Sequence, residues 1–299
     1  MTGISLLIPT YNRAGYLQQA LHSLNALEIP PGVEAEVLVI DNNCTDNTAE
    51  VVDQVARHHK LPVRHILERQ QGLCFGRNRG IAEARYDHLG FLDDDILVSP
   101  QWVVSYFRAV RDFQADAVVG PVFPIFERSQ PDFIRGRALE IISSGYSRKG
   151  ETPLLLPDTT AHELPGCNFG VSRELARRLN GFNTQLDRIG KNLLAGGDTE
   201  FGLRLVASGG RTAYHPGCWI KHVMAEEKLS KAYLRKRAFG SGATVSKMRQ
   251  RPLAVWERIR PTLGIARLWA GVLWSYLTRD PEAFNRELAA RRAMGHLWG

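Results

Sequence analysis

The stretch 88–96 reads HLGFLDDDI, a short apolar run that ends in three adjacent acids. Such a run predicts a buried strand whose loop begins at Asp93. Three neighbouring carboxylates repel one another, and a hard divalent cation bound through oxygen would relieve that repulsion. A solvated acidic turn or a helix cap is the alternative interpretation, because acid clusters are common without a metal.

On either side of this stretch, β-rich apolar runs alternate with helix-like segments over the first 120 residues. The alternation is typical of βαβ units, and it predicts an α/β protein with a mostly parallel sheet and helices on both faces. Ligands of such sheets bind outside the carboxyl ends of the strands. The expected strands are 4–8, 36–40, 63–67, the run before Asp93, and 117–119; the expected helices are 14–27, 46–59, 74–84 and 101–113.

Residues 121–165 contain six prolines and show weak periodicity. We expect a long excursion there, with one helix near 133–143. Regular structure should resume with a strand at 167–171 and a helix at 172–179, which the pair Asn180-Gly181 ends. A further helix at 198–207 and a strand at 212–214 complete the expected elements of this part of the chain.

The net charge of +7 is unevenly distributed. Residues 228–299 hold 15 Lys and Arg against 4 Asp and Glu, a balance of +11, whereas residues 1–227 have a balance of −4. This shift predicts a main domain at 1–227 and a basic extension at 228–299 that meets an anionic partner. We expect no nucleic acid, because no recognition motif accompanies the charge.

The basic extension predicts a helix from Lys228 to Arg251 that carries eight cations and is interrupted by the segment 240–242. The next segment, 263–277, is rich in Leu, Trp and Tyr, and Arg267 is its only charge. It is short for a bilayer span but suits a helix lying in an anionic membrane interface. The alternative is helices packed on the main domain. A third helix is expected to begin at 280–281.

Two features bear on location. The chain shows no apolar N-terminal targeting segment, and its four cysteines are far apart without a CxxC pair. Such cysteines fit a reducing compartment. We therefore expect a cytoplasmic protein, peripheral on the inner face of the membrane if the extension binds lipid.

Six motifs, in order along residues 4–225, resemble those of family 2 glycosyltransferases of the GT-A fold, a Rossmann-like α/β fold. They are Pro9-Thr10-Tyr11-Asn12-Arg13, the segment 41–48 (DNNCTDNT), Gly72-Leu73 with 77–80 (RNRG), Phe91-Leu92-Asp93-Asp94-Asp95, the segment 166–171 (GCNFGV), and Gly197-Asp198-Thr199-Glu200-Phe201.

The resemblance implies a metal-dependent, inverting enzyme. It would move a sugar from a nucleotide-diphosphate donor, preferably a UDP-sugar, to a hydroxyl of a saccharide or lipid-linked saccharide. The implied setting is cell-surface or extracellular polysaccharide assembly, with Mn²⁺ or Mg²⁺ as cofactor and 121–165 on the acceptor side. Two alternatives stay open: a nucleotidyltransferase on a similar fold, and a non-catalytic polysaccharide- or membrane-binding homologue.

The resemblance also assigns the donor site. Asp41 would hydrogen-bond the base, and Arg77, in the loop after the third strand, would lie near the diphosphate. Asp93 or Asp94 would meet the ribose. Asp95 would bind the metal, with His222 as a further ligand and His215 as its competitor. The complete expected nucleotide-sugar site is Pro9, Thr10, Tyr11, Arg13, Asp41, Arg77, Asp93 and Asp94.

Asp198 is the expected catalytic base. Two glycines, Gly196 and Gly197, precede it and allow its loop to approach a substrate closely. Displacement at an anomeric carbon needs a carboxylate that takes the proton of the attacking hydroxyl. The family commonly has Glu-Asp here, whereas this chain has Gly197-Asp198. An ordinary helix N-cap is the alternative role for Asp198, and the two roles are compatible.

Overall fold

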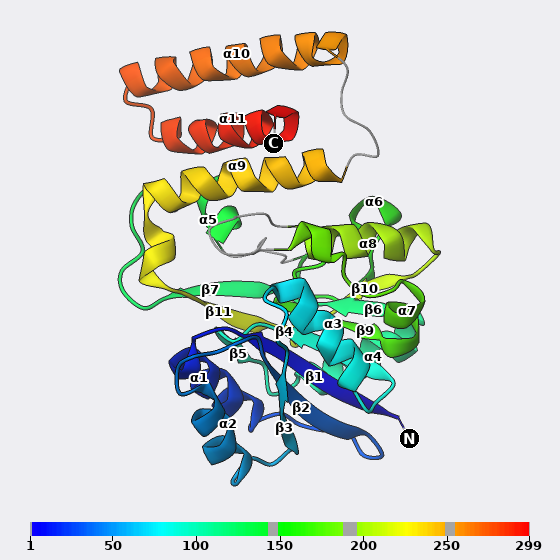
Figure 1. Ribbon diagram of the computed structural model, residues 1–299. Coiled ribbons are helices and arrows are strands. Elements are labelled where there is room, and N and C mark those ends of the chain that lie inside the picture. The colour runs from blue at the N-terminus through cyan, green and yellow to red at the C-terminus, as the bar shows by residue number, and fades with distance from the viewer. Residues whose placement is uncertain (1, 143–148, 188–195, 249–254, 299) are drawn as a thin grey trace. The chain divides into compact units, whose positions relative to one another are not determined.

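The computed structural model describes residues 2–142, 149–187, 196–248 and 255–298, with the backbone alone described for 255–260. The expected α/β class is confirmed. An eight-stranded sheet has the order β3-β2-β1-β4-β9-β6-β10-β8, and a smaller sheet has the order β5-β11-β7 (Figure 1). The strands are β1 (Gly3–Thr10), β2 (Glu34–Asp41), β3 (Val63–Leu67), β4 (His88–Leu92), β5 (Ile96–Val98), β6 (Ala117–Val119), β7 (Val122–Phe126), β8 (Leu154–Leu155), β9 (Asn168–Ser172), β10 (Thr212–Tyr214) and β11 (Ile220–Met224).

The helices alternate with the strands, as the sequence predicts. They are α1 (Ala14–Leu24), α2 (Thr48–Ala56), α3 (Leu73–Glu83), α4 (Trp102–Phe113), α5 (Arg137–Ile142), α6 (Asp158–Ala161), α7 (Arg173–Arg178), α8 (Gly197–Ala207), α9 (Lys231–Lys247), α10 (Val255–Leu277) and α11 (Ala283–Trp298).

Strand β1 is buried along its whole length and sends alternate side chains to the two faces of the sheet. Leu6 and Ile8 belong to the apolar core on one face, which also receives residues of α1, α2 and α4. Leu7 belongs to the core on the other face, which receives residues of α3, α7 and α8. Burial on both faces explains why the strands are nearly continuous apolar runs rather than alternating ones.

Strand register brings the polar clusters to one edge of the sheet. β1 pairs in parallel with β2 and β4, and Thr10 lies opposite Asp41 at the ends of the first two strands. β9 runs antiparallel to β4, with Asn168 opposite Leu92. The start of β9 therefore lies at the edge where β4 ends. This arrangement places 166–168 beside the acidic triplet, although more than 70 residues separate them.

The described residues form two compact units. Of these residues, the first unit contains 2–125, 149–187 and 197–223, and the second contains 126–142, 196, 224–248 and 255–298. Residues 126–142 thus belong to the unit that also contains most of the basic extension, whereas the sequence predicts them as part of the main domain. The functional boundary between 227 and 228 stays a prediction.

Three helices of the second unit stack, with α11 between α9 and α10 (Figure 1). Helix α9 runs through Gly240 and Gly242 without the interruption expected from the sequence. The reason is close packing: a Cβ on Gly242 would overlap the carbonyl oxygen of Arg292, and a Cβ on Gly295 would overlap that of Phe239. The glycines let two helix backbones approach each other, and this gain outweighs their low helix propensity.

Other ends also differ from expectation. Helix α10 begins before 263, and α11 begins at Ala283 rather than at 280–281, because Asp280 caps a turn by accepting from the Glu282 N–H (2.8 Å). The expected end of a helix at Ser143, and the cations Arg249 and Arg251, lie outside the described residues. Among the helices that the structure describes, none combines the length and the apolar character needed to cross a bilayer.

Candidate active site

The second carboxylate of the acidic triplet is held by the loop after β1. Thr10 Oγ1 donates to Asp94 Oδ2 (2.8 Å), and Arg13 Nη1 donates to Asp94 Oδ1 (2.9 Å) and Asp95 Oδ2 (2.8 Å). Burial raises the pKa of Asp94 to about 6, aided by the neighbouring charge of Asp95 and opposed by Arg13 and Thr10. Both oxygens of the Asp94 carboxylate therefore already accept hydrogen bonds from side chains of the protein.

The first and third acids of the triplet lie with a histidine from another strand. Asp93, Asp95 and His222 each offer one ligand atom, and these atoms all lie within 4.8 Å of one another. Strand β11 pairs with β5, which places His222 opposite Ile96. His222 Nε2 lies 3.0 Å from Asp95 Oδ1, and both side chains are buried.

This cluster fits a divalent cation. It offers two carboxylates and an imidazole, groups that bind such ions in proteins. His222 Nδ1 is buried and has no hydrogen-bond partner among the described residues, so one polar atom of the cluster is left unsatisfied. His215, the competing candidate, is outside this cluster, and its Nδ1 accepts from the Gly217 N–H (3.0 Å).

Asp41 ends β2 and is held from two sides. Its Oδ1 accepts from the Cys44 N–H (2.7 Å), and its Oδ2 lies 3.0 Å from His65 Nε2 on the adjacent strand β3. Asp41 is buried, whereas Tyr11, which follows the neighbouring strand β1, is 50% exposed. This end of the sheet thus combines an oriented carboxylate with an accessible aromatic ring.

Arg77 lies inside α3, so the expectation that it belongs to the loop after β3 is wrong: the helix begins at Leu73. The side chain is buried rather than solvated. Its Nη2 donates to the Gly166 carbonyl oxygen (2.7 Å) and lies 3.6 Å from Asp93 Oδ1. The guanidinium stacks over Phe182, with its carbon 5.1 Å from the ring centroid.

Asp198 lies in the first turn of α8. Its Oδ2 accepts from the Gly166 N–H (3.1 Å), and its Oδ1 accepts from the Thr199 N–H (3.0 Å). The carboxylate is therefore oriented by the start of β9 as well as by its own helix. Asp94 and Asp95 are buried, whereas Asp198, like Asp93, remains partly exposed, so it is accessible to a substrate.

The structure thus links most of the predicted site residues. Thr10 and Arg13 bind the triplet through Asp94 and Asp95, and Asp95 lies beside His222. Asp93 lies beside Arg77, and Gly166 connects Arg77 to Asp198 by hydrogen bonds. Asp41 lies beside Thr10 through strand register, and Pro9 is buried within β1. These contacts establish proximity; the individual roles of the residues stay predictions.

Sequence reasoning did not assign a role to three residues of this region. Gly166 was noticed in its motif, but its position between Arg77 and Asp198 depends on the β4–β9 pairing. His65 supports Asp41, and nothing in its strand distinguished it. Asp187 is buried and accepts from the Cys74 N–H (2.9 Å), which caps α3 from a distant loop. A single aspartate in a loop carries no such signal.

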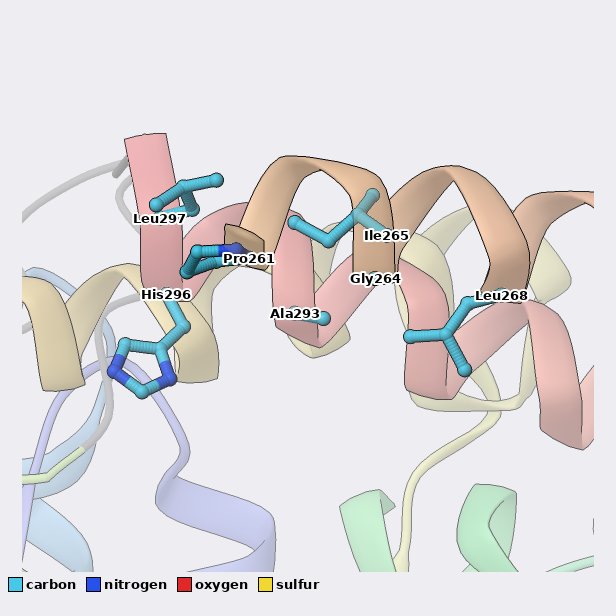
Figure 2. Close-up of a pocket in the computed structure, with 7 residues that line it drawn as sticks. All are labelled: Pro261, Gly264, Ile265, Leu268, Ala293, His296 and Leu297. Carbon is cyan, nitrogen blue, oxygen red and sulfur yellow. The ribbon is translucent and has the colours of Figure 1, made fainter. Parts of the chain in front are cut away.

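One pocket lies apart from this region. It is in the second unit between α10 and α11 (Figure 2), and none of the predicted site residues lines it. Its lining residues are Pro261, Gly264, Ile265, Leu268, Ala293, His296 and Leu297.

Solved structures with the same fold define the class. The fold is that of GT-A transferases. A mannosyltransferase from Pyrobaculum calidifontis, in complex with GDP-Man and Mn²⁺, superposes with a TM-score of 0.65 at 18% identity over 99% of this chain and 87% of that one. Staphylococcus aureus TarS 1–349, in complex with UDP-GlcNAc, gives a TM-score of 0.61 at 18% identity over 85% and 68%.

Residues 5–179 match the family model described as Glycosyl transferase family 2, so the chain belongs to this family and is a glycosyltransferase. The succinoglycan biosynthesis protein ExoM of Rhizobium meliloti is 28% identical over 81% of this chain and 73% of its own length. Escherichia coli chondroitin synthase is 28% identical over 83% of this chain, which spans only 38% of that synthase. Family membership decides against the nucleotidyltransferase alternative.

Proposed function

We propose that this enzyme transfers a sugar from a nucleotide-diphosphate donor, with a UDP-sugar preferred, to a hydroxyl of a saccharide or lipid-linked saccharide in polysaccharide assembly. The observation that carries the proposal is the linked set formed by the Asp93–Asp95–His222 cluster, Arg77 and Asp198. The names of the related succinoglycan and chondroitin proteins support the polysaccharide setting.

In the proposed donor site, Asp41 accepts a hydrogen bond from the base and Tyr11 covers it. Two neighbours already orient Asp41, which lowers the entropy cost of holding a base. Pro9, Thr10 and Arg13 complete this side of the site. Thr10 and Arg13 already donate hydrogen bonds to the Asp94 carboxylate. We therefore propose that Asp94 holds the loop beside the ribose in place, and that Asp93 faces the diphosphate.

Asp93, Asp95 and His222 are the residues that we propose to hold the cofactor. The imidazole favours Mn²⁺ over Mg²⁺, because Mg²⁺ prefers oxygen ligands. When bound, either ion supplies positive charge that neutralises a diphosphate leaving group. Arg77 adds a fixed positive charge 3.6 Å from Asp93, on the side where the diphosphate would lie.

Asp198 is the proposed catalytic base. The acceptor hydroxyl oxygen forms the new bond to the anomeric carbon, the bond from that carbon to the diphosphate oxygen breaks, and Asp198 takes the hydroxyl proton. One direct displacement inverts the anomeric configuration. The Gly166 N–H holds Asp198 Oδ2 and the Thr199 N–H holds Oδ1, and each oxygen keeps a second lone pair with which it could take the acceptor proton.

We also propose that the enzyme works in the cytoplasm at the inner face of a membrane. Four free cysteines fit a reducing compartment, and a lipid-linked acceptor would be presented at that surface. The basic balance of 228–299 fits anionic lipid.

A thermal-shift series tests the donor and metal assignments together. UDP and GDP are each added with and without Mn²⁺, and we expect UDP to raise Tm substantially only when Mn²⁺ is present. The Asp198→Asn variant should keep this shift and lose sugar transfer, since Asp198 is placed on the acceptor side. Absence of a metal-dependent shift with every nucleoside diphosphate would refute the proposed donor site.

A further inference from the structure

Helix α10 is apolar on two opposite faces. Its inner face packs on α11: Ile265 and Val272 are buried, and Trp269 Nε1 donates to Met294 Sδ (3.2 Å). Figure 2 shows Ile265 and Leu268 of α10 and Ala293 and Leu297 of α11 along the pocket that the two helices line. This inner contact explains one apolar face, and it leaves the other face without a partner from α11.

The other face is a continuous exposed stripe. Its large side chains, those of Leu263, Leu273, Trp274 and Leu277, are 62–70% exposed. At 100° per residue, the whole stripe spans about 100° of the helix surface. We call it the outward stripe: Leu263, Ala266, Ala270, Leu273, Trp274 and Leu277. Soluble proteins rarely expose contiguous apolar surface without a binding role.

We propose that the outward stripe binds the surface of an anionic lipid bilayer, with α10 lying parallel to it. The 23 residues of α10 would cover about 34 Å of that surface at 1.5 Å per residue. Leucines and a tryptophan are the side chains that enter the boundary between headgroups and acyl chains. The inference does not depend on the proposed glycosyl transfer.

Charge decides between a bilayer and a second copy of the chain. Arg267 lies at the edge of the stripe, about 20° around the helix from Trp274 at 100° per residue, and residues 261–277 contain no acid. Pairing two copies of 261–277 through this face would bring the Arg267 side chains to the rim of an apolar contact, with no acid of that segment to pair with them, which is unfavourable. At a bilayer, the long side chain of Arg267 reaches lipid phosphate while its stem stays apolar. Arg279, just beyond the helix, is exposed and adds a second cation.

Vesicle cosedimentation of the full chain tests the proposal. We expect binding to vesicles of phosphatidylcholine mixed with phosphatidylglycerol, and weaker binding to phosphatidylcholine alone. The double variant Trp274→Ser with Leu277→Ser should bind at least roughly tenfold more weakly, because two apolar anchors are lost. Arg267→Gln should mainly reduce the preference for the anionic vesicles.

Trp298→Ser is the matched control, because Trp298 is also an exposed tryptophan but lies on α11. It should bind vesicles like the unchanged protein. Brominated lipid should quench the fluorescence of the Trp298→Phe variant, because that variant keeps Trp274 in the bilayer. It should quench the fluorescence of the Trp274→Phe variant much less. All the substituted side chains are exposed, so Tm and its shift on addition of UDP with Mn²⁺ should stay unchanged in all these variants.

Three results would overturn the proposal. The first is no binding of the unchanged protein to either vesicle. The second is an equal loss of binding in the Trp274 and Trp298 variants. The third is a dimer in sedimentation equilibrium that Trp274→Ser dissociates, which would assign the stripe to a second copy. If the unchanged protein binds vesicles but transfers no sugar, the result would contradict the proposed function and leave the membrane proposal intact.

Discussion

Arg77 and Asp198 contact opposite ends of one residue, Gly166. Arg77 Nη2 donates to the carbonyl oxygen of Gly166 (2.7 Å), and the Gly166 N–H donates to Asp198 Oδ2 (3.1 Å). A Cβ at this position would overlap the Asp198 carboxylate and crowd the Arg77 guanidinium. The proposed base and the proposed diphosphate-binding arginine are therefore held by the same glycine.

Gly166→Ala is expected to displace Asp198 and Arg77 and to lower kcat by roughly 10²-fold, since small misplacements in an active site have effects of that size. Steady-state transfer rates measure this effect. Gly15→Ala is the control, because a Cβ on that helical glycine has nothing within 4 Å. Equal activity of the two variants would contradict a positioning role for Gly166.

Asp198→Asn should lower kcat by ~10²- to 10⁴-fold, the usual contribution of a general base, because the amide cannot accept the acceptor proton. The amide keeps the size of the side chain, and its one oxygen can still accept one of the two backbone hydrogen bonds. Calorimetry should show nucleoside diphosphate binding within a few-fold of the unchanged protein. A variant that retains full transfer activity would remove Asp198 from the mechanism.

His222→Gln should weaken Mn²⁺ binding at least roughly tenfold, because loss of even an outer-shell partner commonly costs that much. Titration followed by electron paramagnetic resonance measures free Mn²⁺ directly, without reliance on activity. His215→Gln is the matched control, since His215 lies outside the cluster with Asp93 and Asp95. If both variants bind Mn²⁺ equally well, His222 is not a ligand.

Glu287 connects three helices of the second unit. It accepts from Arg235 of α9 (2.7 Å), Tyr276 of α10 (2.7 Å) and Arg291 of α11 (2.8 Å). Burial alone would raise the pKa of Glu287, but these three hydrogen bonds outweigh it and lower the pKa from 4.5 to about 2.

Because the folded pKa of Glu287 is lowered, its stabilising effect is complete above the unfolded pKa of 4.5 and is lost as the pH falls toward about 2. Glu287→Gln should reduce the free energy of unfolding by about 2 kcal/mol at neutral pH through loss of charge-assisted hydrogen bonds. The substitution should also make the free energy of unfolding fall less steeply as the pH is lowered through this range. Urea unfolding followed across this pH range measures both effects, with the exposed Glu282→Gln as control. An unchanged acid profile would contradict the assigned pKa.

Much of the first unit could be predicted from local sequence. Strands such as Val63–Leu67 and Thr212–Tyr214 have the expected bounds, because an apolar run between helix signals is a local property. The basic extension was less predictable. Gly240 and Gly242 are typical of a break, yet they lie inside α9 because α11 packs closely against that helix.

The α/β class, the family and the set of polar clusters at the strand ends can all be predicted without coordinates, because each depends on residue order and periodicity along the chain. Only the tertiary structure decided how the acidic triplet divides its contacts. Asp94 faces Thr10 and Arg13, whereas Asp93 and Asp95 lie with His222. Three adjacent loop residues look alike in sequence. Their directions are set by β11 pairing with β5 and by β9 pairing with β4, contacts made by segments more than 70 residues away.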